Sequence, residues 1–167
     1  KYIHKQGANL LIIDHHECES YFNETIVINP KTPEDKSNLN ELCATALSFL
    51  VLVFLNNEDI FQKKDIVQYL DLVSLATICD LVPRNNINRS FVKQGLRIIN
   101  SENKNKGIQT LINLTKIKQK ISEYHLGYII GPRINAGGRM GESLLAYNLL
   151  SSENIHQAIQ VAQIIES

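Results

Sequence analysis

The sequence of 167 residues predicts part of an α/β sheet domain followed by a mostly helical extension. Two short segments, residues 9–13 and 25–29, contain unbroken apolar runs bounded by polar residues, which is typical of strands in a parallel sheet. Beyond residue 83 the apolar residues recur at helical spacing. We therefore place the sheet part in residues 1–85 and the extension in residues 86–167.

Each element of the sheet part has its own signal. The second apolar run is stopped by Pro30, which cannot donate a hydrogen bond to a strand ladder. Asn38 has the character of a helix N-cap, and Glu41 three residues later would complete a capping box. These residues predict a buried, almost wholly apolar helix to about residue 55, and a second helix over residues 62–70.

The extension is predicted to be helical. The expected helices cover residues 88–99, 107–114, 122–130, 142–150 and 153–165. Asn88 would cap the first of them, and Gly131-Pro132 would end the third, because proline cannot continue a helix and restricts the residue before it.

The composition is typical of a globular protein and argues against a disulfide-rich or membrane-spanning one. Apolar residues make up 44% and charged residues 20%, as in ordinary globular proteins. The three cysteines, Cys18, Cys43 and Cys79, are widely spaced, which favours reduced thiols in a cytoplasmic protein over a disulfide framework or zinc ribbon. The longest apolar run, residues 42–55, is shorter than the about 20 residues of a membrane span.

The net charge of zero conceals an uneven distribution. Residues 1–83 carry 6 Lys/Arg against 12 Asp/Glu, and residues 84–140 carry 11 Lys/Arg against 2 Asp/Glu. An acidic part that could hold cations thus precedes a basic part that could hold a polyanion. Lysines scattered over solvated helix faces would give the same count, so both interpretations stay open.

Asp14, His15 and His16 follow directly after the first predicted strand. Ligands of open α/β sheets bind at the carboxyl ends of strands. Adjacent side chains diverge in extended backbone, so one histidine would face a metal and the other a second ion or the substrate. Mixed histidine and aspartate ligands suit Mn²⁺, with Mg²⁺ possible where carboxylates dominate. The alternative is a polar surface turn without a metal.

Residues 75–83 form a second apolar run that delivers one carboxylate, Asp80, just before Pro83. A carboxylate in such surroundings is costly to desolvate unless it is paired or bound to a cation. Taken alone, Asp80 would be a helix or turn cap. Together with Asp14-His15-His16 it favours a metal site built from two segments.

Residues 131–141 combine glycines with two arginines. Arg133 and Arg139 flank Asn135 and the pair Gly137-Gly138. Glycines allow backbone N–H groups to approach an anion, arginine binds phosphate oxygens bidentately, and a following helix would add its dipole. The segment predicts a phosphate-binding loop, and a plain connection between helices remains the alternative.

These three segments, in this order, resemble the DHH family of phosphoesterases, and within it the single-strand-specific 5′ exonucleases. Residues 11–17 resemble the family's third motif, and residues 75–83 its fourth, with Ala76 where glycine is more usual. Residues 131–139 resemble a loop that the family's pyrophosphatases lack. The resemblance implies that residues 1–85 are the C-terminal portion of a Rossmann-like parallel-sheet DHH domain, followed by a basic helical connector.

The resemblance also implies roles for individual residues. The implied metal ligands are His15, His16 and Asp80. Asp14 and His16 are implied to be catalytic. The residues implied to hold phosphate oxygens near the 5′ end of the strand are Arg133, Asn135, Gly137, Gly138 and Arg139. The implied reaction is two-metal hydrolysis of single-stranded DNA with Mn²⁺ or Mg²⁺ in DNA repair and recombination, with the basic helices guiding the strand.

One departure from the family pattern concerns the remaining carboxylates. The family's earlier motifs include an Asp-x-Asp pair, which this sequence does not contain. Three ligands cannot readily hold two hard cations that each need about six. The sequence begins at Lys1 rather than Met, and its last helical pattern still runs at Ser167. We therefore expect an internal piece that is inactive alone and needs an N-terminal segment with further aspartates.

The sequence leaves two other functions open. One is hydrolysis of oligonucleotides or pyrophosphate by the same broad family. The other is a non-catalytic remnant of a split gene with weak nucleic-acid binding. The arginine-bearing segment and the basic block favour the exonuclease.

Overall fold

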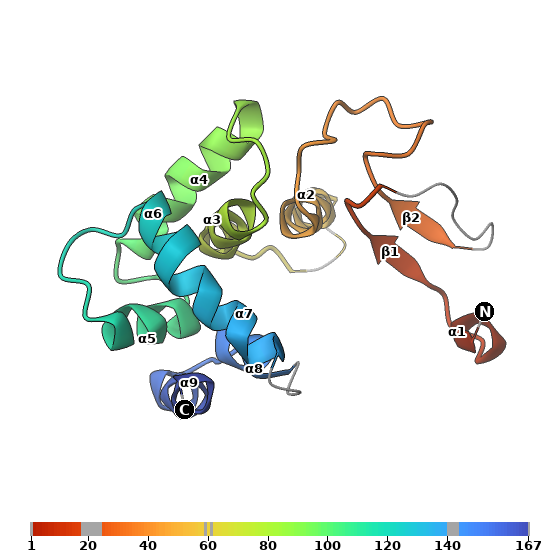
Figure 1. Ribbon diagram of the computed structural model, residues 1–167. Coiled ribbons are helices and arrows are strands. Elements are labelled where there is room, and N and C mark those ends of the chain that lie inside the picture. Colours follow the sequence, from red (N-terminus) through yellow and green to blue (C-terminus); the bar gives the residue numbers. More distant parts are fainter. Residues whose placement is uncertain (1, 18–24, 59, 61, 140–143, 167) are drawn as a thin grey trace. The chain divides into compact units, whose positions relative to one another are not determined.

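A computed structural model describes residues 2–17, 25–58, 60, 62–139 and 144–166. The chain forms two compact units, Lys1–Lys64 and Asp65–Ser167 (Figure 1). Strands occur in the first unit and the second unit is helical in its described residues, which confirms the predicted α/β fold with a helical extension.

The first unit contains a parallel pair of strands, β1 (Leu11–Ile13) and β2 (Ile26–Ile28), with Leu11 opposite Ile26 (Figure 1). Both lie inside the predicted runs, so these predictions are confirmed. A short helix, α1 (Tyr2–Lys5), precedes them. Because the strands are parallel, the residues that follow β1 and β2 lie at the same edge of the pair.

The longer helix of the first unit, α2 (Ala44–Asn57), begins five residues later than predicted. Asn38 does not cap it, because its φ of 58° lies in the left-handed region, which asparagine tolerates in turns. The N-cap residue is Cys43. Leu42 and Cys43 are buried in the turn before the helix, so their apolar character reflects packing rather than helical periodicity.

The helix predicted over residues 62–70 is wrong for most of its length. Residues 62–66 are not helical, and a 3₁₀ turn, η1 (Val67–Tyr69), leads into α3 (Leu70–Cys79). The apolar run that precedes Asp80 is therefore a helix, and it is buried on several sides.

The second unit contains the remaining elements. They are α3, α4 (Asn86–Ile99), α5 (Lys106–Thr115), α6 (Glu123–His125), η2 (Leu126–Ile130), α7 (Gly131–Arg139), α8 (Leu144–Leu150) and α9 (Ile155–Glu166). Their core includes fully buried Ile99, Ile108, Leu126 and Leu149. Helices α3 and α4 lie side by side (Figure 1), and a Cβ at Gly95 would overlap the carbonyl oxygen of Leu70, so the two helices are in tight contact there.

The start of α4 differs from the prediction. Asn85 is the N-cap residue and Asn88 lies inside the first turn, where it is buried. The side-chain amide of Asn88 donates a hydrogen bond to the carbonyl of Pro83 at 2.9 Å. Asn88 therefore fastens the connection after α3 instead of capping the helix.

Gly131-Pro132 does not end the third predicted helix, because α7 continues directly from η2. Residues 126–130 form a π-helical turn in which the N–H of Gly131 donates to the carbonyl of Leu126. This wide turn makes room for the ring and the missing N–H of Pro132. The usual restriction on the residue before proline involves its Cβ, which Gly131 lacks.

The division by packing falls at residues 64/65 rather than at 85/86. Helix α3 packs against α4 and η2 within the second unit. The predicted boundary at residues 85/86, between the portion of the catalytic domain and the helical connector, stays a prediction. Among the described residues, no helix combines the length and apolar character that a membrane crossing requires.

Candidate functional site

The Asp14-His15-His16 segment lies at the carboxyl end of β1. The N–H of Asp14 donates to the carbonyl of Ile28 at 3.0 Å, which extends the strand pairing by one bond. The chain then turns, because Oδ1 of Asp14 accepts the backbone N–H groups of His15 at 2.8 Å and His16 at 3.3 Å. The predicted position at a strand end is therefore confirmed.

The Asp14 carboxylate also fixes one imidazole. Nδ1 of His16 lies 2.7 Å from Oδ1 of Asp14. This side-chain hydrogen bond, followed by the backbone N–H of His15, holds the pKa of Asp14 below its ordinary value. Asp14 is thus a carboxylate that orients His16, the arrangement that metal-binding histidines use to present their other nitrogen.

The two histidine rings lie next to each other. Their centroids are 4.5 Å apart and their planes are tilted by 46°. The expectation that the two histidines face different ions, or an ion and the substrate, stays a prediction.

Asn29 is a positioning residue that the sequence analysis missed. It follows β2 and is 5% exposed. Its side-chain amide donates to the carbonyl of His16 at 2.9 Å, and its side-chain oxygen accepts the N–H of Lys31. Asn29 therefore ties the histidine turn to the neighbouring strand end. Its place just before Pro30, at the end of a strand run, is a signal that could have identified it.

Asp80 lies in the second unit, as the C-cap residue of α3. Its N–H donates to the carbonyl of Ala76 at 2.9 Å, and Leu81 after it has a φ of 55°. Asp80 is exposed, so the expected cost of desolvating its carboxylate is not incurred. Its role as a metal ligand stays a prediction.

The neighbouring Cys79 is a weak candidate for chemistry. Burial, with the adjacent Asp80 charge, raises the pKa of its thiol above the ordinary value. The thiol lies against the carbonyl of Leu126 at 3.8 Å. In the described residues no group of three His, Cys, Asp or Glu side chains gathers as a complete metal site. The predicted ligands His15, His16 and Asp80 are of types that bind Mn²⁺ or Mg²⁺, and they would supply part of the ligand set of such a site.

The predicted phosphate-binding loop is helical from residue 131 to 139, as α7. The expectation of a glycine-rich loop is therefore wrong for these residues, because the π turn carries the helix past Pro132. Interior helical N–H groups are engaged in the helix, so a backbone nest of the kind expected does not form there. Gly137, Gly138 and Arg139 are described only as helix backbone, and Met140 and Gly141 lie outside the described residues.

Arg133 links two helices. Its guanidinium donates to the carbonyl of Ile129 at 2.7 Å, and its Nε lies 2.7 Å from Oε1 of Glu166 near the end of α9. Asn135 on the same helix is exposed. The assignment of both residues to phosphate binding stays a prediction, and for Arg133 it competes with a structural role.

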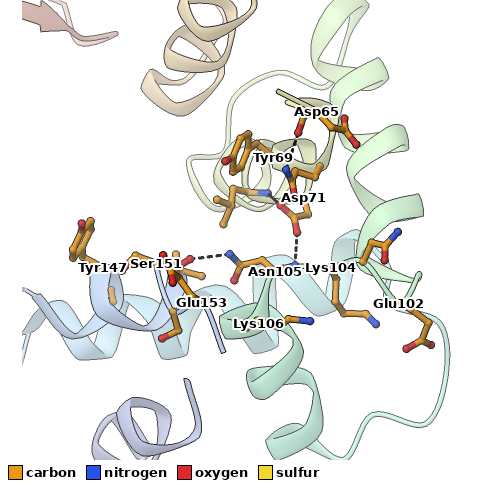
Figure 2. Close-up of a pocket in the computed structure, with 16 residues that line it drawn as sticks. Asp65, Tyr69, Asp71, Glu102, Lys104, Asn105, Lys106, Tyr147, Ser151 and Glu153 are labelled. Atoms are coloured by element: carbon orange, nitrogen blue, oxygen red, sulfur yellow. Dashed lines mark hydrogen bonds between the residues drawn. The ribbon is translucent and has the colours of Figure 1, made fainter. Parts of the chain in front are cut away.

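A separate hollow of about 930 Å³ opens between the helices of the second unit (Figure 2). Its wall includes the buried carboxylate of Asp71, which accepts the N–H groups of Leu72 at 2.6 Å and Asn105 at 2.7 Å. Desolvation raises the pKa of Asp71. Among the described residues that line this hollow, none is a predicted site residue, and Asp71 serves to join α3 to the start of α5.

Comparison with known proteins identifies relatives that share nearly the whole of this chain. No model of a protein family matches the chain. The single-stranded-DNA-specific exonuclease RecJ of Salmonella typhimurium is 27% identical over 172 residues, which cover 96% of this chain and 30% of that protein. The chain thus spans between 20% and 30% of the length of the curated relatives it matches.

Two solved structures are similar to nearly the whole chain. A crystal structure of exonuclease RecJ bound to manganese has a TM-score of 0.82 at 25% identity, and covers 99% of this chain and 41% of its own. RecJ from Thermus thermophilus, in complex with Mn²⁺, has a TM-score of 0.81 at 26% identity, with coverages of 97% and 24%.

Proposed function

We propose, on the premise that this chain is homologous to the RecJ single-stranded-DNA-specific exonucleases over nearly its whole length, that it is part of a metal-dependent exonuclease. The complete protein would hydrolyse phosphodiester bonds of single-stranded DNA from the 5′ end. The observation that carries this proposal is the histidine turn at the end of β1, which Asp14 and Asn29 hold in place.

In this proposal His15, His16 and Asp80 are metal ligands. Imidazole nitrogen and carboxylate oxygen suit Mn²⁺ and Mg²⁺, the ions named in the solved RecJ structures. A missing N-terminal segment would supply the further aspartates. Bound ions would supply an activated water and stabilise charge at the phosphate. Asp14 orients His16, so that its Nε2 is the nitrogen offered to an ion or to the scissile phosphate.

Phosphate binding is assigned to α7. Positions 135 and 139 are four residues apart and share one helix face, so Asn135 and Arg139 would act together on the strand. Gly137 and Gly138 would let the sugar-phosphate backbone approach the helix closely. Arg133 would bind a phosphate if it exchanged its contact with Glu166 for the DNA. The basic helices of residues 84–120 would guide the strand, and we place the protein in the cytoplasm, in DNA repair and recombination.

The experiment compares three substrates with the full-length protein in the presence of Mn²⁺. We expect mononucleotides to be released from the 5′ end of single-stranded DNA, while duplex DNA and pyrophosphate stay intact. Preferred hydrolysis of pyrophosphate or of short oligonucleotides would favour the small-substrate phosphoesterase. No hydrolysis of any substrate by the folded protein would favour the non-catalytic remnant. The 167-residue chain alone is expected to be inactive.

A further inference from the structure

We infer that Tyr124 and Tyr128 form a base-stacking platform for single-stranded nucleic acid, separate from the metal ligands and from α7. This inference names a contact surface for the substrate class of the proposed function and rests on that function. It starts from two exposed aromatic rings on one helical segment. Tyr124 is 61% exposed and Tyr128 is 75% exposed.

The two rings stack on each other. Their centroids are 5.2 Å apart and their planes differ by 28°. The residues are four positions apart and therefore lie on the same side of the segment. Large aromatic rings that are stacked and left in water offer a flat face to which a nucleotide base can add.

A buried histidine, His125, lies beside the platform and contacts Tyr124. His125 is 5% exposed, and its Nδ1 accepts the N–H of Ser122 at 2.9 Å in a capping box. The side-chain amide of Gln119 lies 2.9 Å from its Nε2. The ring of Tyr124 meets His125 edge-on at 5.8 Å. Tyr128 lies within the π turn, a feature that recurs at functional sites.

Basic side chains lie beside the platform. An open hollow of about 560 Å³ is lined by Tyr124 together with Lys116 and Lys118. Lys116 ends α5 in the left-handed conformation that glycine or asparagine usually takes there. Among the described residues that line the hollow none is acidic, and nearby Glu123 is paired with Arg84.

This combination defines the ligand by its chemistry. Bases stack on aromatic faces irrespective of sequence, and lysines bind the phosphates that connect the bases. A duplex keeps its bases stacked inside, so the platform selects a single strand. A protein segment that covers the rings in the complete protein is the alternative, and the test must distinguish the two.

The test measures binding of a fluorescent oligothymidylate of about 16 nucleotides to the 167-residue chain by anisotropy. Tyr128→Ala and Tyr124→Ala should each lower the affinity about fivefold or more, while Tyr128→Phe retains it because the ring remains. Tyr147→Ala removes an equally exposed tyrosine from α8 and should change nothing. Lys118→Ala should reduce the slope of log affinity against log salt by about 0.7, and Lys36→Ala should not.

Three results would overturn the inference. The first is that the chain does not bind the oligonucleotide. The second is that the Tyr124→Ala/Tyr128→Ala variant binds it as tightly as the original chain. The third is that Tyr128 is protected from nitration in DNA-free full-length protein, which would show that a protein segment covers the rings. Failure of the proposed function would appear differently, as absence of Mn²⁺-dependent cleavage by the full-length protein. Cleavage with unchanged oligonucleotide affinity in the double variant would reject the platform and leave the exonuclease standing.

Discussion

Nδ1 of His16 lies 2.7 Å from Oδ1 of Asp14, and the same oxygen accepts the backbone N–H of His15. One carboxylate thus shapes the turn after β1 and fixes the orientation of an imidazole. With Nδ1 engaged, Nε2 is the atom through which His16 would bind an ion.

Asp14→Asn in the full-length protein should lower Mn²⁺-dependent cleavage of single-stranded DNA by about 10- to 100-fold, because a neutral amide orients the imidazole less strongly. Strand affinity should change little. Asp35→Asn is the matched control, since Asp35 makes a similar local turn with Ser37 in the same unit. Cleavage at the original rate by Asp14→Asn would contradict the orienting role.

Asp71 gives a pH-dependent prediction. Its pKa is raised, mainly by desolvation, so the folded state binds the proton more tightly than the unfolded state. Its contribution to the free energy of unfolding therefore falls as pH rises from the ordinary value of 3.8 through the raised one. Asp71→Asn removes this contribution, and the stability of the original protein relative to the variant should decline across that window.

The same variant should lose stability at neutral pH by about 1–3 kcal/mol, because its amide nitrogen would face the N–H of either Leu72 or Asn105. Urea unfolding at several pH values measures both effects. Glu102→Gln, at an exposed position around the same hollow, should shift the unfolding free energy by less than about 0.5 kcal/mol. Parallel pH profiles for Asp71→Asn and the original protein would refute the prediction.

Gly95 and Gly127 form a pair of contrasting positions. A Cβ at Gly95 would overlap the carbonyl oxygen of Leu70 and the side chain of Ser74, so Gly95→Ala must push α3 and α4 apart. We expect a loss of about 1–3 kcal/mol. At Gly127 the nearest atom, Cγ2 of Ile78, would be 3.2 Å away, and Gly127→Ala should cost clearly less. Thermal unfolding of both variants measures the difference. Equal losses of unfolding free energy would show that the contact between α3 and α4 at Gly95 is not tight.

Arg133 can be tested against its partner Glu166. If Arg133 binds a phosphate, Arg133→Ala should weaken binding of a 5′-phosphorylated strand about tenfold, because a charge-assisted hydrogen bond is lost. Glu166→Gln breaks the same ion pair but leaves the arginine, so strand binding should be retained and stability should fall by at most about 1 kcal/mol. Equal effects of both variants on binding would reduce Arg133 to a link between helices.

The sequence identified the strands and the residues at their ends because their apolar runs are short and end abruptly. It placed the start of α2 too early, because Asn38 and Glu41 match a capping pattern although both residues lie before the helix. The prediction that Gly131-Pro132 ends a helix is wrong for a different reason. Sequence patterns for helix ends do not anticipate a π turn, which here accommodates the proline.

Parts of the candidate site depend on contacts between distant residues. Asn29 is recognisable only once β1 and β2 are paired, because its partner is the carbonyl of His16. The link between Arg133 and Glu166 joins α7 to α9 across 33 positions of the sequence. Such pairings follow from tertiary packing, which periodicity does not encode.

We propose that His15 and Asp80 bind the ions that drive cleavage. The most direct measurement is the single-turnover rate of single-stranded DNA cleavage by the full-length protein at saturating Mn²⁺. We predict that His15→Ala and Asp80→Ala each lower this rate by about 1,000-fold or more, as loss of transition-state stabilisation by a metal requires. A rate within a few-fold of the original in either variant would contradict the claim.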